Sequence, residues 1–190
     1  MKAKENPFRV ERLHELPYLF PEGDSFAQFF TRVEANHFRG ALVGPHGAGK
    51  TTLLLELLDE LDRRNIEYRH LQLRDESGFN KGRQLADWIS TAPSSAVLVL
   101  DSAGLLNWWD WQLLRFRCRS FAGLIVTLHR ERNVPTLVRC RPSVAVLKDL
   151  VERLSPDSSW SESMLQDRFA QHGGNLRDCL RSFYDDFSAQ

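Results

Sequence analysis

The residues best suited to chemistry in this chain form one glycine-rich stretch that ends in lysine and threonine. It consists of Gly44, Pro45, His46, Gly47, Ala48, Gly49, Lys50, Thr51 and Thr52. The stretch fits the pattern G-x-x-x-x-G-K-[ST], known as Walker A, in which a glycine-rich turn holds phosphate groups. An apolar run, residues 40–43, precedes it, and a leucine-rich run, residues 52–58, follows it. Strand, turn and helix in this order are what phosphate binding requires.

The chemistry of this loop follows from its residue types. Glycines allow the backbone to curl so that several N–H groups point at one anion, and the start of the following helix adds its dipole. We expect Lys50 to reach the β- and γ-phosphates of a nucleotide, and Thr51 to hold Mg²⁺ through its hydroxyl. The alternative is a glycine turn without a ligand, which leaves the Lys-Thr pair at the helix start unexplained.

A carboxylate at the end of an apolar strand is the second candidate. Residues 96–101 read Ala-Val-Leu-Val-Leu-Asp, a run typical of a parallel strand covered on both faces. In a chain with a phosphate-binding loop, an acidic residue at the carboxyl end of such a strand is the Walker B pattern. We therefore predict that Asp101 helps to hold Mg²⁺. The alternative is an aspartate that only caps the following turn.

These candidates need a scaffold, and apolar periodicity predicts alternating strands and helices. We expect helices over residues 25–36, 50–64, 82–91, 107–119, 143–154, 161–172 and 175–187, and strands over 40–43, 66–73, 96–101, 121–128 and 136–140. Such alternation with short connections predicts an α/β fold with a five-stranded parallel sheet and helices on both faces. Ligands of such sheets bind at the carboxyl ends of the strands, where both candidates fall.

We expect two parts in the chain. Residues 1–142 are predicted to form the nucleotide-binding core with an N-terminal arm, and residues 143–190 a short helical segment, or lid. Residues 1–23 combine turn formers with several large apolar side chains, so we expect an ordered arm that lies on the core.

Composition restricts the class of protein. The chain has 190 residues with 25 basic and 25 acidic side chains, so its net charge does not indicate nucleic acid or a membrane surface as partner. The three cysteines form no CxxC pair, which is typical of a reducing compartment. No apolar run is long enough to cross a membrane. We therefore expect a soluble, cytoplasmic protein without membrane association.

Two local features stand out from this even composition. Residues 112–141 contain seven arginines and one acid, Glu131, and such a basic stretch could face phosphate, a partner or water. Trp108, Trp109 and Trp111 cannot all point the same way on a helix. Core packing is the simpler interpretation of this cluster, and an exposed tryptophan would offer a protein partner a site in the region 108–111.

With these motifs the chain resembles the AAA+ ATPases, a branch of the P-loop proteins. Residues 44–51 match Walker A and residues 97–101 match Walker B. Thr127 or His129, at the end of the fourth strand, matches the polar sensor that touches the γ-phosphate. The resemblance implies ATP and Mg²⁺ as ligands and the strand order 5-1-4-3-2.

The resemblance extends to both ends of the chain. Residues 174–177, Gly-Asn-Leu-Arg, resemble a second sensor, which implies that Arg177 reaches the nucleotide from the lid. Residues 6–9 and 16–18 resemble the segment that lines the adenine pocket in the initiator and clamp-loader branches.

The sequence also departs from the AAA+ pattern. Ser102 stands where these ATPases carry the glutamate that orients the attacking water. Glu76, at the end of the neighbouring strand, is an alternative base, as in RecA-like proteins. The lid is short, so ring assembly and an arginine finger are not indicated. Residues 101–104 also fit the D-x-x-G of GTPases, but no N-K-x-D motif follows, which leaves GTP a minor alternative.

Three functions compete at this point. The first is a Mg²⁺-dependent ATPase in which Lys50, Glu76, His129 and Arg177 act on the γ-phosphate or the attacking water. The second is an ATP-operated switch that binds ATP without hydrolysing it. The third is a small kinase that uses arginines 130, 132, 139 or 141 on the transferred phosphoryl group.

Overall fold

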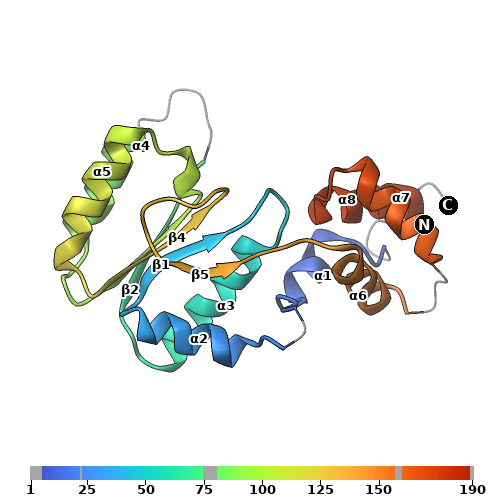
Figure 1. The fold of residues 1–190 in the computed structure, drawn as a ribbon, viewed down its shortest axis with the longest axis horizontal. Helices are drawn as coiled ribbons and strands as arrows, with labels where there is room; N and C mark the ends of the chain where they lie inside the picture. The colour runs from blue at the N-terminus through green and yellow to red at the C-terminus, as the bar shows by residue number, and fades with distance from the viewer. Residues whose placement is uncertain (1–5, 22, 75–80, 157–159, 189–190) are drawn as a thin grey trace. The chain divides into compact units, whose positions relative to one another are not determined.

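The strands and helices of the chain alternate as predicted. The structure, a computed structural model, describes residues 6–21, 23–74, 81–156 and 160–188. Figure 1 shows the elements in chain order: α1 (Val10–Glu15), α2 (Phe26–Ala35), β1 (Arg39–Val43), α3 (Lys50–Arg63), β2 (Tyr68–Gln72), α4 (Lys81–Thr91), β3 (Val97–Asp101), η2 (Ala103–Leu105), α5 (Trp108–Arg117), η3 (Cys118–Ser120), β4 (Gly123–Leu128), β5 (Thr136–Arg139), α6 (Val144–Leu154), α7 (Glu162–Gln171) and α8 (Leu176–Ser188).

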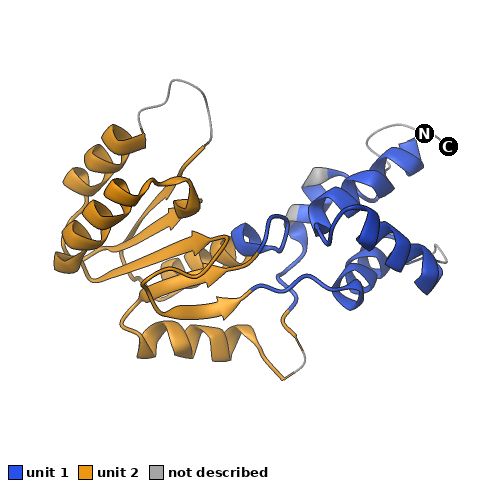
Figure 2. Cartoon of the chain, turned by 45° about the horizontal axis from the view of Figure 1, so that its top comes forward, with its two compact units in different colours: residues 1–19, 45–52, 140–190 blue, residues 20–44, 53–139 orange. Residues whose placement is uncertain are grey.

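Contacts divide the chain into two compact units, which Figure 2 shows in different colours. Unit 1 consists of Met1–Leu19, Pro45–Thr52 and Cys140–Gln190. Unit 2 consists of Phe20–Gly44 and Leu53–Arg139. The whole sheet therefore belongs to unit 2, and most of the Walker A loop belongs to unit 1.

Unit 2 is built on a five-stranded parallel sheet in the order β2-β3-β4-β1-β5. This confirms the predicted order 5-1-4-3-2. Val43 of β1 is paired with Leu128 of β4, and Leu100 of β3 with Val126. The register thus brings the carboxyl ends of β1, β3 and β4 to the same edge of the sheet.

Helices cover both faces of this sheet, α4 and α5 on one and α2 and α3 on the other (Figure 1). Because successive side chains of a strand point to opposite faces, residues 98 and 100 of β3 pack with α4 and α5 while residues 97 and 99 point to the opposite face. Every residue of β3 and β4 is buried, which explains their unbroken apolar sequences. Strand β2 lies at the edge and is partly exposed, so its sequence is mixed.

A charged side chain ties α2 to the edge strand β5 in unit 2. Ser25 caps the helix by accepting a hydrogen bond from the N–H of Gln28. Arg32 donates from both terminal nitrogens to Asp24, at 3.1 and 2.8 Å, and from Nε to the carbonyl of Leu137 at 3.1 Å. The hydrogen bond from Arg32 lowers the pKa of Asp24 below its usual value.

In unit 1 the N-terminal arm packs on the C-terminal helices. Phe8 is 1% exposed and stacks on Phe183 of α8, with ring centroids 5.4 Å apart. Asn6 donates through Nδ2 to the carbonyl of Tyr184 at 2.8 Å. Residues 6–19 belong to unit 1, in which the Phe8 ring and the Asn6 amide find their partners on α8. In the described part of the chain no helix is long and apolar enough to span a membrane.

Candidate functional site

The Walker A loop has the backbone that its glycines predict. Gly47 and Gly49 adopt φ angles of 70° and 79°, a left-handed conformation that other residues rarely adopt. Helix α3 begins at Lys50, directly after the turn, and its first turn carries no acidic side chain. The positive end of the helix dipole therefore lies at the loop without a neighbouring carboxylate on the same turn. Lys50 Nζ donates to the carbonyl of Pro45 at 2.6 Å, so the ammonium group lies over the loop.

Within unit 1 the start of α8 lies against this loop. A Cβ atom placed on Gly47 would lie 1.7 Å from Oδ1 of Asn175 and 3.2 Å from the backbone nitrogen of Arg177. Asn175 in turn accepts a hydrogen bond from the Arg177 N–H at 3.1 Å. The segment that resembles the second sensor is thus in contact with Walker A, and Arg177 has an exposed side chain next to it.

The arm contributes an aromatic ring to the same loop. A Cβ atom placed on Gly49 would lie 3.0 Å from the ring of Tyr18. Tyr18 also hydrogen-bonds Cys140, which lies close enough to Lys50 to feel its charge. Burial raises the pKa of the Cys140 thiol, and these two neighbours only partly oppose the effect. The predicted adenine-pocket segment therefore contacts the Walker A loop through Tyr18.

In unit 2, Asp101 ends β3 and lies in a hydrogen-bond network. The residue is 2% exposed. Thr127 of β4 donates its hydroxyl to Oδ1 of Asp101 at 2.5 Å and accepts from the N–H of Ser102 at 2.7 Å. Ser102 N–H also donates to Oδ1 at 2.8 Å, and Gln72 of β2 donates to Oδ2 at 3.3 Å. Residues from the ends of three adjacent strands thus fix the orientation of this carboxylate.

The two candidates for the first sensor occupy different environments. Thr127 is 1% exposed, and its hydroxyl proton is used on Asp101. His129 is half-buried, and its ring lies beside Gly104, where an added Cβ would be 3.1 Å from Cδ2. The Thr127 hydroxyl is therefore a support of Asp101, and the sensor role of His129 stays a prediction. On β2, burial lowers the pKa of His70, and the charge of Asp101 partly opposes this shift.

The position directly after Asp101, where the AAA+ pattern has a water-orienting glutamate, holds Ser102. Ser102 follows Asp101 in a left-handed turn, with φ of 62° and ψ of 31°. Its N–H donates to Asp101 and Thr127, and its short side chain has no carboxylate. Glu76 lies in residues 75–80, outside the described part of the chain.

The residues present fit a nucleotide and a magnesium ion chemically. Mg²⁺ prefers hard oxygen ligands and is usually bound by one or two protein groups together with phosphate oxygens. Asp101 supplies a carboxylate, and Thr51, in the first turn of α3, supplies a hydroxyl. No cluster of three or more His, Cys, Asp or Glu side chains that could hold a metal occurs among the described residues. Each of the two groups is thus of a chemical type that Mg²⁺ accepts beside phosphate oxygens.

Two arginines of the kinase alternative, Arg132 and Arg139, have partners within unit 2. Arg139 pairs with Glu131, from Nε at 2.7 Å and from a terminal nitrogen at 2.5 Å. Arg132 lies over the ring of Trp111, with the guanidinium carbon 5.0 Å from the ring centroid, and donates to the carbonyl of Leu106 at 3.4 Å. Two of the four arginines thus have structural partners within unit 2.

The tryptophan cluster is more exposed than core packing predicts. Trp111 is 4% exposed and belongs to the core, whereas Trp108 and Trp109 are 60% and 75% exposed. Sequence reasoning missed two contributions: Gln72 as a partner of Asp101, and Asn175 as a contact of Gly47. The only sequence signal for Gln72 was its position as a polar residue at the end of β2, a strand that the sequence predicts.

Comparison with known proteins gives the same architecture. No protein-family model and no curated protein sequence matches the chain. Two solved structures of RuvB from Thermotoga maritima are similar to the chain. A RuvB mutant aligns over 83% of this chain and 59% of its own, with 18% identity and a TM-score of 0.57. The RuvB Holliday junction branch migration motor aligns over 94% of this chain and 63% of its own, with 17% identity and a TM-score of 0.56.

The chain has the fold of RuvB. RuvB is an AAA+ P-loop ATPase, so the resemblance drawn from the motifs is confirmed at the level of the fold. The chain spans about three-fifths of the length of the RuvB chains that it matches.

Proposed function

We propose that this chain binds Mg-ATP through its Walker A loop and hydrolyses it slowly or not at all. The observation that carries the proposal is the loop itself: two glycines with positive φ, followed directly by Lys50, Thr51 and the start of α3. Successive backbone N–H groups in such a turn form an anion-binding concavity, to which the helix dipole adds. The RuvB fold supports this role for the segment between β1 and α3.

The remaining residues take the following roles in the proposal. Lys50 binds the β- and γ-phosphates, and Thr51 and Asp101 hold Mg²⁺, which neutralises charge on the phosphates. Thr127 keeps Asp101 in place. His129 and Arg177 respond to the γ-phosphate, and Tyr18 lies where the base would bind.

Slow hydrolysis follows from the residue after Asp101. A general base must come within hydrogen-bond distance of the attacking water. The hydroxyl of Ser102 cannot take up a proton at neutral pH as a carboxylate can. We therefore expect turnover well below about one per second, the lower end of ordinary enzymes. A glutamate at position 76 remains the proposed alternative base.

A change at α8 accompanies binding in this proposal. Asn175 lies against Gly47, and the N–H of Arg177 is held by the same asparagine. We infer that a phosphate bound by the loop alters this contact and with it the first turn of α8. This makes the chain an ATP-operated switch whose signal begins at Asn175.

Titration calorimetry with Mg-ATP and Mg-GTP tests the proposal directly. We expect ATP to bind to the wild type and Lys50→Ala to weaken binding by about 10- to 100-fold, since a charge-assisted hydrogen bond to phosphate is lost. Lys148→Ala, which removes an exposed lysine of α6, is the matched control and should bind as the wild type does. Equal ATP affinity of both variants would refute the role of the loop.

Phosphate release by the same proteins separates the alternatives. Binding with turnover below about 0.01 per second supports the switch, and faster turnover abolished by Lys50→Ala supports the ATPase. Glu76→Gln then decides whether that residue is the base: an unchanged rate in this variant removes it from the mechanism.

A further inference from the structure

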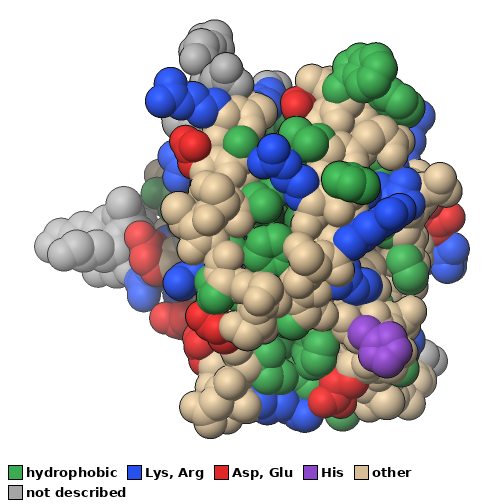
Figure 3. Space-filling model, turned by 90° about the vertical axis from the view of Figure 1, so that its left-hand side faces the viewer, with side chains coloured by type: hydrophobic (Ala, Val, Ile, Leu, Met, Phe, Trp, Pro, Cys, Tyr) green, Lys and Arg blue, Asp and Glu red, His purple; other side chains and the backbone are tan. Residues whose placement is uncertain are grey.

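The outer surface of α5 exposes aromatic side chains that unit 2 does not use for packing. Trp108, Trp109 and Phe116 are 60%, 75% and 70% exposed, and Leu113 is 40% exposed. The rings of Trp108 and Trp109 meet edge to face with centroids 4.6 Å apart. Figure 3 shows hydrophobic and basic side chains interspersed on the side of the molecule that carries α4 and α5. Exposed aromatic groups in such number are typical of a binding surface.

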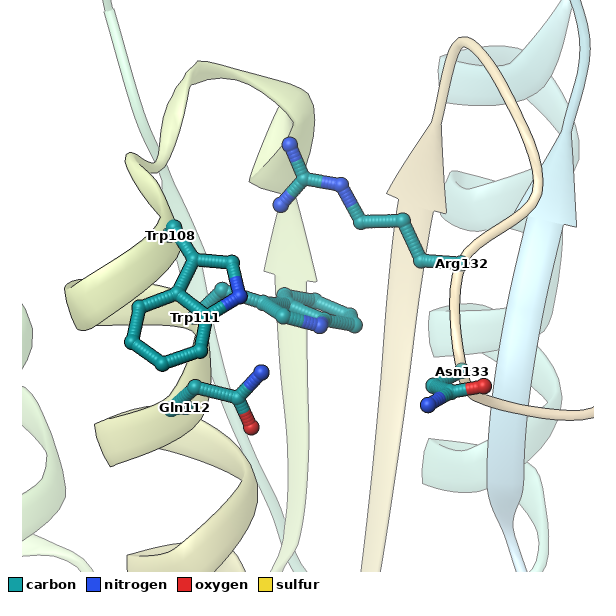
Figure 4. A pocket seen from close by; sticks show the side chains of 5 residues that line it. All are labelled: Trp108, Trp111, Gln112, Arg132 and Asn133. Atoms are coloured by element: carbon teal, nitrogen blue, oxygen red, sulfur yellow. The ribbon is translucent and has the colours of Figure 1, made fainter.

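A pocket opens at the N-terminal end of this surface. It is lined by five residues: Trp108, Trp111, Gln112, Arg132 and Asn133 (Figure 4). Its volume of about 330 Å³ lies at the lower end of ligand sites and suits one planar ring system. The two indoles supply flat apolar walls, and the two amides each supply donors and an acceptor. A flat ligand with hydrogen-bonding edges matches this lining.

In the part of the sequence that surrounds the pocket, the positive charge is supplied by arginine. Residues 96–140 contain no lysine. Within the described ranges, no carboxylate forms an ion pair with Arg115, Arg117, Arg119, Arg130 or Arg132. The acid of α5, Asp110, is held by the amide of Asn107 at 2.8 Å. Guanidinium groups bind phosphate in two-pronged fashion and stack on planar rings, which lysine does not do. The surface therefore favours an anion that repeats along a chain.

We propose that the α5 face binds single-stranded nucleic acid. The face is formed by Trp108, Trp109, Phe116, the two arginines of the helix, Arg115 and Arg117, and Arg119, whose guanidinium carbon lies 5.8 Å from the centroid of the Phe116 ring. Unstacked bases offer ring faces to the exposed tryptophans, and one base fits the pocket with its edge toward Gln112 and Asn133. The arginines contact the phosphates. A duplex hides the ring faces inside its base stack, so the aromatic groups select single strands.

An acidic peptide explains fewer of these observations. Its carboxylates would pair with the arginines and its apolar side chains would cover Phe116 and Leu113. An acidic peptide would leave the two amides of the pocket, Gln112 and Asn133, without a role. All residues of the α5 face belong to unit 2, and none is a residue proposed to bind ATP. The inference thus stands independently of the proposed ATP site.

Fluorescence anisotropy with a labelled thymidine 20-mer tests the proposal on the full chain. We expect binding at 50 mM salt, weakened at least about 10-fold when Trp108 and Trp109 are both changed to alanine, because stacking of even one base contributes this much. Arg117→Ala should reduce the slope of log affinity against log salt by about 0.7. Arg153→Ala, which removes an exposed arginine of α6, is the matched control and should leave both quantities unchanged.

Two further measurements distinguish single-stranded nucleic acid from a duplex and from an acidic protein. A 20-bp duplex should bind more weakly than the single strand, and poly-glutamate should compete poorly. No binding of the thymidine 20-mer or of a mixed-sequence RNA 20-mer would overturn the proposal. So would binding that the tryptophan double variant retains in full while its circular dichroism matches the wild type. Competition by poly-glutamate as strong as by DNA would assign the surface to an acidic protein instead.

Discussion

Replacing Thr127 by valine removes one hydroxyl from the most constrained part of unit 2. Valine has nearly the same volume and the same strand preference, so the packing of β4 is kept. The hydroxyl donates to the Asp101 carboxylate at 2.5 Å, and both residues are buried. A hydrogen bond to a charged group contributes about 1.5–3 kcal/mol, and a buried carboxylate that loses such a partner bears part of its desolvation cost.

The expected loss follows from these values. Asp101 keeps the Ser102 N–H at 2.8 Å and the more distant Gln72 amide at 3.3 Å, so the network is weakened without collapsing. We therefore expect a loss of about 2 kcal/mol of unfolding free energy. For a chain of this size that corresponds to a decrease in Tm of about 4–8 °C. Because the carboxylate becomes freer to rotate, Mg²⁺-dependent ATP affinity should also fall.

Differential scanning calorimetry of three proteins checks this prediction. The matched control is Thr136→Val on β5, a partly buried strand threonine whose hydroxyl makes no hydrogen bond within the described residues. The control should change Tm by less than about 2 °C. If Thr127→Val lowers Tm no more than the control, the hydroxyl does not support Asp101, and the reasoning about this network is wrong.

Three other predictions concern the loop, the cysteines and the edge of unit 2. Gly47→Ala should abolish ATP binding and cost about 1–3 kcal/mol, because a Cβ there meets Asn175 at a φ of 70°; a double-mutant cycle with Asn175→Ala should show coupling, and additive effects would contradict the contact. The thiols of Cys118, Cys140 and Cys179 should react with a disulfide reagent at pH 8 at least about 100-fold more slowly in the native than in the unfolded chain. Burial raises the pKa of all three thiols, and it raises that of Cys118 to about 12. Asp24→Asn should cost up to about 1 kcal/mol at pH 7. Because Arg32 lowers the pKa of Asp24 in the folded state, this stabilisation is present above about pH 4, the usual aspartate value, and is lost as the pH falls through the lowered pKa. The Tm values of variant and wild type should therefore converge as the pH decreases.

The strands could be predicted because local patterns determine them, whereas their order in the sheet followed from the resemblance to the AAA+ ATPases. An unbroken apolar run such as residues 96–101 is stable only with both faces covered, and short connections leave few topologies. The Walker A loop could be predicted because positive φ at Gly47 and Gly49 and the helix start after them are encoded within nine residues. These features depend on near neighbours in the chain.

The remaining features depend on residues far apart in sequence. Nothing local indicates that Asn175 lies against Gly47, or that Phe8 packs on Phe183 and so takes the arm to the C-terminal helices. The exposure of Trp109 was equally hidden, because the helical pattern of α5 has apolar residues on every side and favours core packing. The partner of the buried Thr127 hydroxyl became evident only from the pairing of β3 beside β4.

The central claim is that the loop ending at Lys50 binds ATP, and the effect of Mg-ATP on thermal unfolding tests it most directly. A ligand at a hundred times its Kd adds about 2.7 kcal/mol of stability, so Tm of the wild type should rise by about 5–10 °C. The Tm of Lys50→Ala should rise less with Mg-ATP than that of the wild type, and Mg-GTP should have little effect on either protein. An unchanged Tm of the wild type, or an equal rise in the variant, would contradict the claim.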